Sequence, residues 1–426
     1  MKKTSYLFAA MLLAALGSGF SPVTVNAVQA QEAADPAKLT VRAEMGKPLA
    51  EIQELLNAKQ YPQAIEKINA LDALEKKTPY EIFAIQRMRA VVASSTNDTA
   101  LMASSFDSMI NSEFLKEPEK MRLIEAMAGT YFNEKKYPLA KEWANRYLAK
   151  DPGNVGMNNL IARAYYLEND FPNAIKVLNN QLVEDDKAKR NPTQENLKLL
   201  ASAYQQIKDK NGYATVLERM IALYPQKEYW PDMLYSVERR PGFSDRLRLD
   251  LYRLLLKTES LDDGPQFVEM VELALLAGLP AEAKTAVDAG YAANLLGTGK
   301  EAAKHKQLRD KAYKQAADDI KTLDAGEASA KNAKTGVGLL NIGYNYVING
   351  QHEKGLALME QGMTKGGLKF ADEAKLHLGM AYLQAGNREK AKEVFSTIQS
   401  TDGTADLARL WLLVPAAGTA AAPAAK

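Results

Sequence analysis

The chain has 426 residues, which exceeds the size at which a single compact core stops growing, so several domains or an elongated repeat array are expected. Hydrophobic residues make up 46% and charged residues 25%, which excludes wholesale disorder, and the absence of cysteine excludes disulfides, thiolate metal sites and cysteine nucleophiles. With 54 basic and 52 acidic residues the net charge is near neutral, so there is no general electrostatic reason to expect a nucleic-acid partner.

The first predicted element is a secretory signal peptide over residues 1–30. It has a basic start at Lys2 and Lys3, an apolar run from Leu7 to Leu16 and a small-residue cleavage site that ends at Ala30. The apolar run is about half the length that a membrane-spanning helix needs. We therefore expect a periplasmic protein with no membrane span after cleavage, and the alternative is a retained anchor.

Residues 31–44 are predicted to form a flexible lead, and helical patterning begins at about Val41. Apolar residues then recur at helical spacing, as at Leu49, Ile52 and Leu56, and no convincing alternating strand is present. Short breaks that carry Pro, Gly or Asn, such as residues 151–153, predict antiparallel helix neighbours. The sequence therefore predicts an all-α fold.

Internal repeats are the strongest signal in the sequence. Five positions recur after a shift of 34 residues: Ala128, Tyr131, Tyr137, Pro138 and Ala140 match Ala162, Tyr165, Phe171, Pro172 and Ala174. Near the end of the chain, Leu378-Gly379-Met380-Ala381-Tyr382 is followed by Ala391 and Phe395. On these residues the chain resembles the tetratricopeptide repeat family.

The resemblance implies a right-handed superhelical solenoid of antiparallel helix pairs. We expect an N-terminal repeat block over 45–296, a charged helix and linker over 297–335, and C-terminal repeats over 336–413. Residues 414–426 are predicted to be a disordered tail rich in Ala and Pro. Residues 80–118 and 226–263 are helical by pattern but lack the repeat signature, so they are either degenerate pairs or bends.

No sequence motif for catalysis or metal binding is found. A phosphate-binding loop, a nucleophile elbow and a paired-histidine motif are all missing, and His305, His352 and His377 lie apart. Adjacent acids such as Asp262-Asp263 and Asp318-Asp319 diverge by about 100 degrees on a helix and do not cooperate. We therefore predict a non-catalytic protein without metal or cofactor, and an enzyme with an unrecognised site remains as a third hypothesis.

In tetratricopeptide arrays the first helix of each pair lines the concave side, which supplies the candidate ligand contacts. The resemblance selects eight of them: Arg122, Glu125, Asn133, Asn159, Arg163, Tyr166, Asn341 and Tyr344. These guanidinium, amide and phenol groups suit an extended peptide, a terminal carboxylate or sugar hydroxyls. The lysine and asparagine positions of the family's carboxylate clamp do not match, so binding of chaperone tails is not supported.

The resulting hypothesis is a non-catalytic periplasmic adaptor. Its concave groove would bind a protein or peptide segment, within an assembly of the cell envelope. The alternative is a structural scaffold for polysaccharide secretion, with a glycan in the groove.

Overall fold

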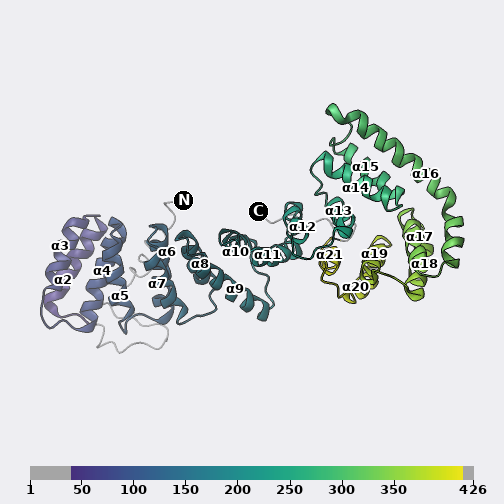
Figure 1. Ribbon diagram of the computed structural model, residues 1–426. Helices are drawn as coiled ribbons and strands as arrows, with labels where there is room; N and C mark the ends of the chain where they lie inside the picture. Colours follow the sequence, from purple (N-terminus) through teal and green to yellow (C-terminus); the bar gives the residue numbers. More distant parts are fainter. Residues whose placement is uncertain (1–39, 416–426) are drawn as a thin grey trace, which may run out of the picture. The chain divides into compact units, whose positions relative to one another are not determined.

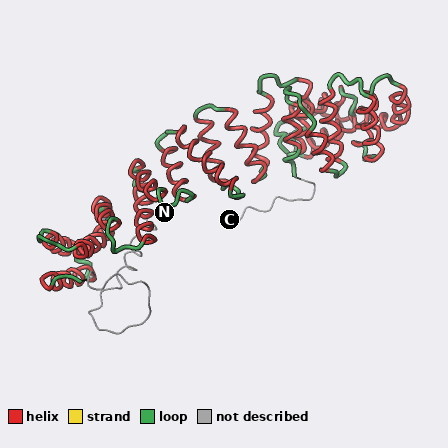
Figure 2. Tube along the Cα trace, turned by 90° about the horizontal axis from the view of Figure 1, so that it is seen from below, coloured by secondary structure: helices red, strands yellow, loops and turns green. Residues whose placement is uncertain are grey.

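The computed structural model describes residues 40–415, and all of their regular structure is helical (Figures 1 and 2). The all-α prediction is therefore confirmed. The chain packs into two compact units, the first ending at Asp209 and the second starting at Lys210. The predicted signal peptide, most of the predicted lead and most of the predicted tail lie outside the described residues.

The first unit is a succession of helices that each pack on the next one along the chain. They are α2 (Ala43–Asn57), α3 (Tyr61–Asp72), α4 (Pro79–Thr96), α5 (Thr99–Ile110), α6 (Glu117–Asn133), α7 (Tyr137–Leu148), α8 (Val155–Leu167), α9 (Phe171–Lys187) and α10 (Gln194–Gln206). Residues 79–110, which lack the repeat signature, form the pair α4 and α5.

The repeated turn that the sequence predicts begins the second helix of three pairs. Tyr61, Tyr137 and Phe171 are the first residues of α3, α7 and α9, and each is followed by a proline in the first turn of its helix. A proline costs little there because the amide at that position has no intrahelical partner. Within each pair the small side chains are fully buried, as at Ala128 and Ala140, which lets the two helices approach closely.

The second unit is less regular at its start and paired towards its end. It contains α11 (Lys210–Leu223), α12 (Trp230–Glu238), α13 (Arg248–Lys257), α14 (Gly264–Leu276), α15 (Pro280–Ala292), α16 (Ala302–Asn332), α17 (Val337–Ile348), α18 (His352–Lys365), α19 (Ala371–Gln384), α20 (Arg388–Ser396) and α21 (Thr404–Trp411). Short 3-10 turns precede α12, α13 and α16.

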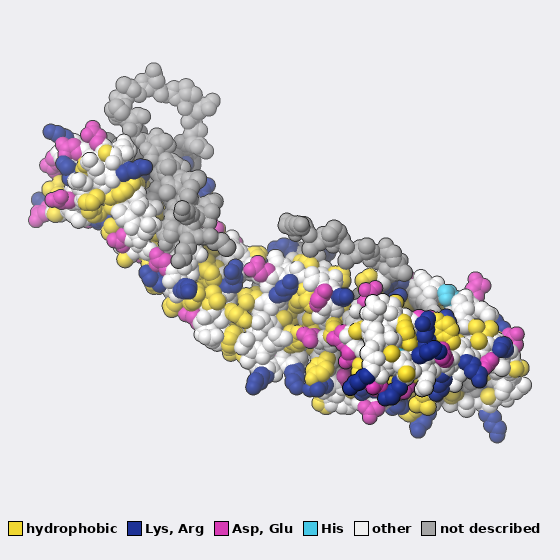
Figure 3. Space-filling model, turned by 90° about the horizontal axis from the view of Figure 1, so that it is seen from above, with side chains coloured by type: hydrophobic (Ala, Val, Ile, Leu, Met, Phe, Trp, Pro, Cys, Tyr) yellow, Lys and Arg dark blue, Asp and Glu magenta, His cyan; other side chains and the backbone are white. Residues whose placement is uncertain are grey.

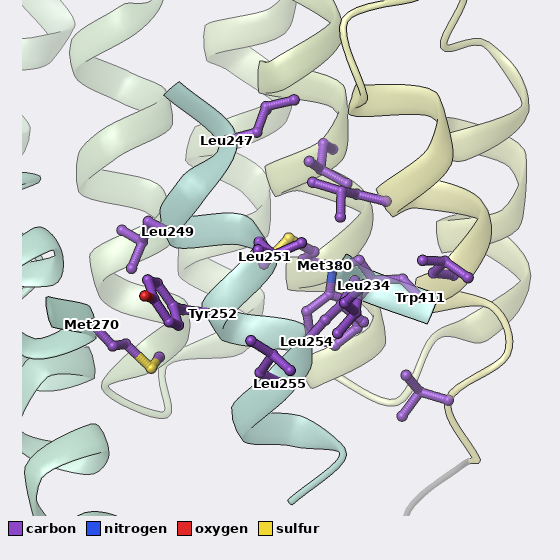
Figure 4. Close-up of a cluster of buried hydrophobic side chains, with 14 of the residues drawn as sticks. Leu234, Leu247, Leu249, Leu251, Tyr252, Leu254, Leu255, Met270, Met380 and Trp411 are labelled. Atoms are coloured by element: carbon purple, nitrogen blue, oxygen red, sulfur yellow. The ribbon is translucent and has the colours of Figure 1, made fainter. Parts of the chain in front are cut away.

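The last helix of the second unit closes the unit on itself. Figure 4 shows Leu234 of α12 and Leu254 of α13 in one apolar cluster with Met380 of α19 and Trp411 of α21. The backbone amide of Ser244 donates to the carbonyl of Asp402 at 2.9 Å. The two ends of this unit therefore share a hydrophobic core.

The charged stretch predicted at 297–335 is a single long helix, and this corrects the expected linker. Helix α16 continues to Asn332 because Ala312, Ala316 and Leu323 are buried along it, where it packs on α15 and α17. Its Lys side chains are exposed, as are Asp310, Asp318 and Asp324, and basic and acidic groups are interspersed over the right-hand part of Figure 3. Residues 296 and 336, the predicted block boundaries, thus lie inside the second unit.

Helices α17 and α18 cross at two glycines, Gly343 and Gly355, where their backbones are in close contact. A Cβ atom on Gly343 would lie 2.6 Å from the carbonyl oxygen of Gly355. Substitution of Gly343 by alanine should therefore lower the free energy of opening of α17 and α18 by about 1–3 kcal/mol, as overpacking does. Native-state amide hydrogen exchange measures that quantity helix by helix.

The same substitution at Gly129 is the matched control. No atom lies within 4 Å of a Cβ built there, and the residue is inside α6. We expect Gly129→Ala to stabilise α6 by about 0.5–1 kcal/mol, because alanine loses less conformational entropy on folding. Equal protection of α17 and α18 in the Gly343 variant and the parent protein would show that the crossing is not tight.

Candidate functional site

The second unit contains a cavity of about 550 Å³. Its walls come from α13, α14, α17, α18 and α19, and from the segments that precede α13 and α19. Helices far apart in the sequence meet there because α21 holds α19 against the start of the unit. We treat this cavity as the candidate site.

The mouth of the cavity exposes apolar side chains that a folded protein usually buries. Leu276 at the end of α14 is 86% exposed, the largest value among the exposed large hydrophobic side chains of residues 40–415. Val337 and Phe370, which also line the cavity, are exposed as well. Further inside, Leu273 and Leu340 continue the apolar wall.

The floor of the cavity is a buried network of charged side chains. Arg253 and Asp250 lie one turn apart on α13 and are only 5% and 2% exposed. Arg253 donates from Nε and Nη2 to the two carboxylate oxygens of Glu282, at 2.6 and 2.7 Å, and from Nη1 to Asp250 Oδ1 at 2.6 Å. One guanidinium therefore satisfies two carboxylates, which is the condition for burying them.

His377 on α19 completes the network from the far end of the unit. Its Nε2 lies 3.0 Å from Asp250 Oδ1. The same Nε2 lies 3.3 Å from Nη1 of Arg253. The ring of Tyr344 lies against both partners, 5.2 Å from the Arg253 guanidinium and 5.8 Å from the His377 ring.

The burial of these groups shifts their pKa values. Burial alone would raise the pKa of Asp250, but His377 and Arg253 outweigh it and lower the pKa to about 2. Burial also opposes the charge of Arg253, yet Glu282 and Asp250 raise the pKa of that guanidinium. The pKa of the Tyr344 phenol is raised by its burial. Asp250 and Arg253 therefore stay charged at neutral pH.

The lowered pKa of Asp250 predicts an acid-sensitive second unit. A carboxyl whose pKa falls from an ordinary 3.8 to about 2 on folding stabilises the folded state fully above pH 4. This contribution, about 2 kcal/mol, is lost as the pH falls from 4 to 2. Asp250→Asn should flatten the loss of stability across that range, measured by urea unfolding followed through near-ultraviolet circular dichroism. An unchanged slope would contradict the assignment.

The rim of the cavity carries two more arginines, each bound to two acids. Arg246 lies 3.1 Å from Glu373 and 3.0 Å from Asp402, and its guanidinium is 3.6 Å from the centre of the Phe370 ring. Arg248 is 3.2 Å from Glu238 and also contacts Glu269. These ion pairs connect the start of the unit with α19 and with the segment before α21.

The structure brings two of the eight predicted ligand contacts to this cavity. Asn341 and Tyr344 on α17 line it, although the Tyr344 side chain is largely buried. The other six residues belong to the first unit, so the eight do not form one surface within a unit.

In the first unit, three of the predicted contacts bridge α8 to α10. Asn159 Oδ1 accepts a hydrogen bond from Asn196 at 2.8 Å, Tyr166 shares one with Ser202 at 2.7 Å, and Arg163 lies 3.5 Å from Glu195. Helix α8 carries Ala162 and Tyr165 of the repeated pattern and is the first helix of a predicted pair. The remaining three, Arg122, Glu125 and Asn133, are exposed on α6.

Sequence reasoning missed the four residues of the cavity floor. Asp250 and Arg253 are spaced as an ordinary helical ion pair, and Glu282 and His377 carry no motif of their own. Asp250 and His377 are 127 positions apart, and only the packing of α19 on the start of the unit brings them together.

Two further findings concern metals and membranes. Across residues 40–415, no cluster of three or more His, Asp or Glu side chains is arranged to hold a metal ion. None of the helices described in that range combines the length and the apolarity required to cross a bilayer.

Comparison with known proteins places the end of the chain in a family. Residues 373–402, which hold α19 and α20, match the family model described as a tetratricopeptide repeat. This segment is a tetratricopeptide repeat. The resemblance inferred from Leu378 to Phe395 is thereby confirmed, and no curated protein matches the sequence.

Several solved structures are similar to the chain. The C-terminal part of a tetratricopeptide repeat-containing protein from Cytophaga hutchinsonii is 17% identical, with 60% of this chain and 98% of that chain covered and a TM-score of 0.30. Yeast Tom70 is 14% identical, with 86% and 94% covered and a TM-score of 0.17. A structure of Naa15/Naa10 bound to HypK-THB is 12% identical, with 86% and 70% covered and a TM-score of 0.23.

The tetratricopeptide repeat has a general functional meaning. Proteins built from this repeat bind protein partners and serve as interaction scaffolds, in general without catalysis. Residues 373–402 therefore form a repeat of a kind that serves in protein–protein interaction.

Proposed function

We propose that the protein is a non-catalytic adaptor that binds a peptide segment of a partner protein in the cavity of its second unit. The observation that carries this proposal is the exposure of Leu276, Val337 and Phe370 around one cavity. Exposed apolar side chains scattered singly need no explanation, but a group rimmed by charged residues marks a binding surface. A side chain of the bound peptide would cover these exposed apolar groups.

The depth and polarity of the cavity suit a peptide better than a flat contact surface. A volume of about 550 Å³ is in the range of ligand-binding clefts, and the apolar walls surround a small number of fixed polar groups. Asn341 at the wall offers an amide that both donates to and accepts from a peptide backbone. Affinity would come from the apolar contacts and orientation from the polar groups.

The cellular setting of the adaptor is proposed from the sequence. The basic start, apolar run and small-residue site of residues 1–30 support export to the periplasm, and a cell-envelope assembly is the setting that follows. Mass spectrometry of the protein recovered from a periplasmic extract tests this, since we expect a chain that begins after Ala30. Recovery from the cytoplasm with Met1 retained would contradict export.

The alternative function, a scaffold for polysaccharide secretion, rests on the tyrosine and asparagine side chains of the predicted groove. Tyr166 and Asn159 each already bond to a side chain of α10. Retention of the protein on a glycan column would favour this alternative over the adaptor.

The adaptor is tested by mild crosslinking of residues 31–426 in envelope extract, followed by pull-down. Two variants accompany the parent protein: Leu276→Ser with Phe370→Ser at the cavity, and Arg122→Ala with Arg163→Ala on the first unit. We expect a protein partner that is lost only in the cavity variant. Loss only in the first-unit variant would move the site to α6 and α8, and capture of glycan without protein would favour the polysaccharide scaffold.

A further inference from the structure

Two segments beside the cavity of the second unit are in contact with one another. Residues 333–337 link α16 to α17, and residues 365–370 link α18 to α19. The backbone amide of Gly336 donates to the carbonyl of Gly366 at 2.8 Å. We call these two segments the loop pair, and their side chains lie next to one another at the edge of the unit.

The loop pair carries three lysines that have no acidic partner. Lys334, Lys365 and Lys369, here called the loop lysines, are exposed. None of them forms an ion pair with a carboxylate of residues 40–415, although Lys365 Nζ donates to the carbonyl of Lys331 at 2.8 Å. A carbonyl is neutral, so all three positive charges remain uncompensated.

The acids close to the loop pair are already bound by other cations. Asp372 lies 2.7 Å from Lys375, and Glu373 lies 3.1 Å from Arg246. Glu327 contacts two lysines at 2.6 and 2.9 Å. The arginines of the cavity are likewise each held by two carboxylates, so the loop lysines are the cations of this region that an added anion could pair with.

The positive charge is confined to one side of the cavity mouth. Asp245, which lines the cavity, and Glu272, one turn before Leu276, are exposed acids that form no ion pair among the described residues. They belong to the segment before α13 and to α14. An anionic group is therefore drawn to the loop pair and away from α14.

The same loop pair exposes apolar side chains. Val337 and Phe370 are 43% and 39% exposed and line the cavity together with Leu276. A partner that matches this surface carries carboxylates next to apolar side chains. The cavity is a recess of about 550 Å³, which admits single side chains of a peptide and suits a flat bilayer surface less well.

We propose that the loop pair selects a partner segment in which acidic residues flank apolar ones, with the carboxylates on the loop lysines and the apolar side chains in the cavity mouth. This specificity rests on the proposed adaptor function and narrows it to acidic partner segments. The loop lysines lie outside the positions that the repeat pattern selects as ligand contacts, because they belong to connections between helices.

Three dye-labelled peptide amides of equal length test the proposal by fluorescence anisotropy with residues 31–426. They share a core of leucine and phenylalanine and differ only in its flanks, which are glutamate, glutamine or lysine. At low salt we expect the glutamate peptide to bind about tenfold more tightly than the uncharged glutamine peptide, as several exposed ion pairs would give, and the lysine peptide to bind weakest. Added salt should reduce this difference because it screens exposed charges.

Two variants locate the effect at the loop pair. Lys334→Gln, Lys365→Gln and Lys369→Gln together should bring the glutamate-to-glutamine ratio of affinities close to one. Replacement of the same three lysines by glutamate should reverse the order, so that the lysine peptide binds tightest. All three positions are exposed, so both variants should fold.

The matched control removes three lysines from the outer side of α16. Lys304, Lys306 and Lys321 are 78%, 73% and 71% exposed, and each already pairs with an acid one turn away. Their replacement by glutamine changes the net charge equally and should leave the ratio of affinities unchanged. An equal effect of the two glutamine variants would show that only the overall charge matters, which would overturn the proposal.

The remaining outcomes separate the acidic specificity from the adaptor function. Equal binding of the glutamate and glutamine peptides would overturn the specificity and leave an apolar peptide site. Absence of binding by all three peptides would also overturn it, and the crosslinking experiment would then decide the adaptor function independently. Sedimentation with phosphatidylglycerol vesicles, but not with phosphatidylcholine vesicles, that depends on the loop lysines would overturn the proposal in favour of a membrane surface.

Discussion

Replacement of Arg253 by methionine is expected to lower the free energy of unfolding of the second unit by about 3–5 kcal/mol. Asp250 and Glu282 both direct their carboxylates at this guanidinium, and without it two buried negative charges would face one another. Methionine keeps most of the volume and removes the charge. Urea unfolding followed through near-ultraviolet circular dichroism measures the loss.

Arg409→Met is the matched control for this prediction. Arg409 also contacts two acids, Glu218 and Asp406, but its side chain is 45% exposed. Because water screens such exposed ion pairs, we expect Arg409→Met to lower the free energy of unfolding by less than about 1 kcal/mol. Similar losses in the two variants would mean that burial does not set the strength of the network, and the account of the cavity floor would be wrong.

Replacement of Leu407 by alanine is expected to lower the free energy of unfolding of the second unit by about 2–5 kcal/mol. Leu407 is fully buried in the core that α21 shares with the start of the second unit. Removal of its side chain leaves a cavity at the point where the two ends of the unit meet. Amide exchange should accelerate in α12, α13 and α19 as well as in α21.

Leu276→Ala is the same substitution at an 86% exposed position. It should change stability by less than about 0.5 kcal/mol, as surface substitutions do. It should nevertheless weaken binding of the partner, because Leu276 stands at the mouth of the cavity. Faster exchange confined to α21 in the Leu407 variant would refute the idea that α21 holds the unit together.

Much of the fold can be predicted from the sequence because the repeats encode it locally. The residues Tyr137 and Phe171 begin helices α7 and α9 as the repeated turn predicts, and helical spacing alone identifies the all-α class. Local patterns do not encode the end of α16. Gly326 and the neighbouring small residues resemble a linker, but packing on α17, where Gly326 meets Ile342, continues the helix.

The candidate site is less accessible to sequence reasoning. Tyr344 and Asn341 were selected because their helix carries the repeat pattern, and both line the cavity. Asp250 lies in the region without repeat signature, and His377 has no nearby histidine to suggest a site. Contacts over such sequence separations depend on how α19 docks, which no local pattern specifies.

The six contacts predicted for the first unit remain predictions. Their selection follows from the position of each residue on the first helix of a predicted pair. Part of their hydrogen-bonding capacity is used between α8 and α10, as with Asn159 and Asn196. Such bonds position neighbouring repeats, whereas Arg122 and Glu125 are exposed on α6.

The docking of α21 has an evolutionary consequence. An open array of repeats tolerates the gain or loss of one unit, because each repeat contacts only its neighbours. In the second unit, insertion of one more helix pair between α13 and α19 would separate Leu254 from Trp411 and Asp250 from His377. Duplication of a repeat should therefore be tolerated before Asp209 and selected against after it, so length variation among descendants of this gene should fall in the first unit.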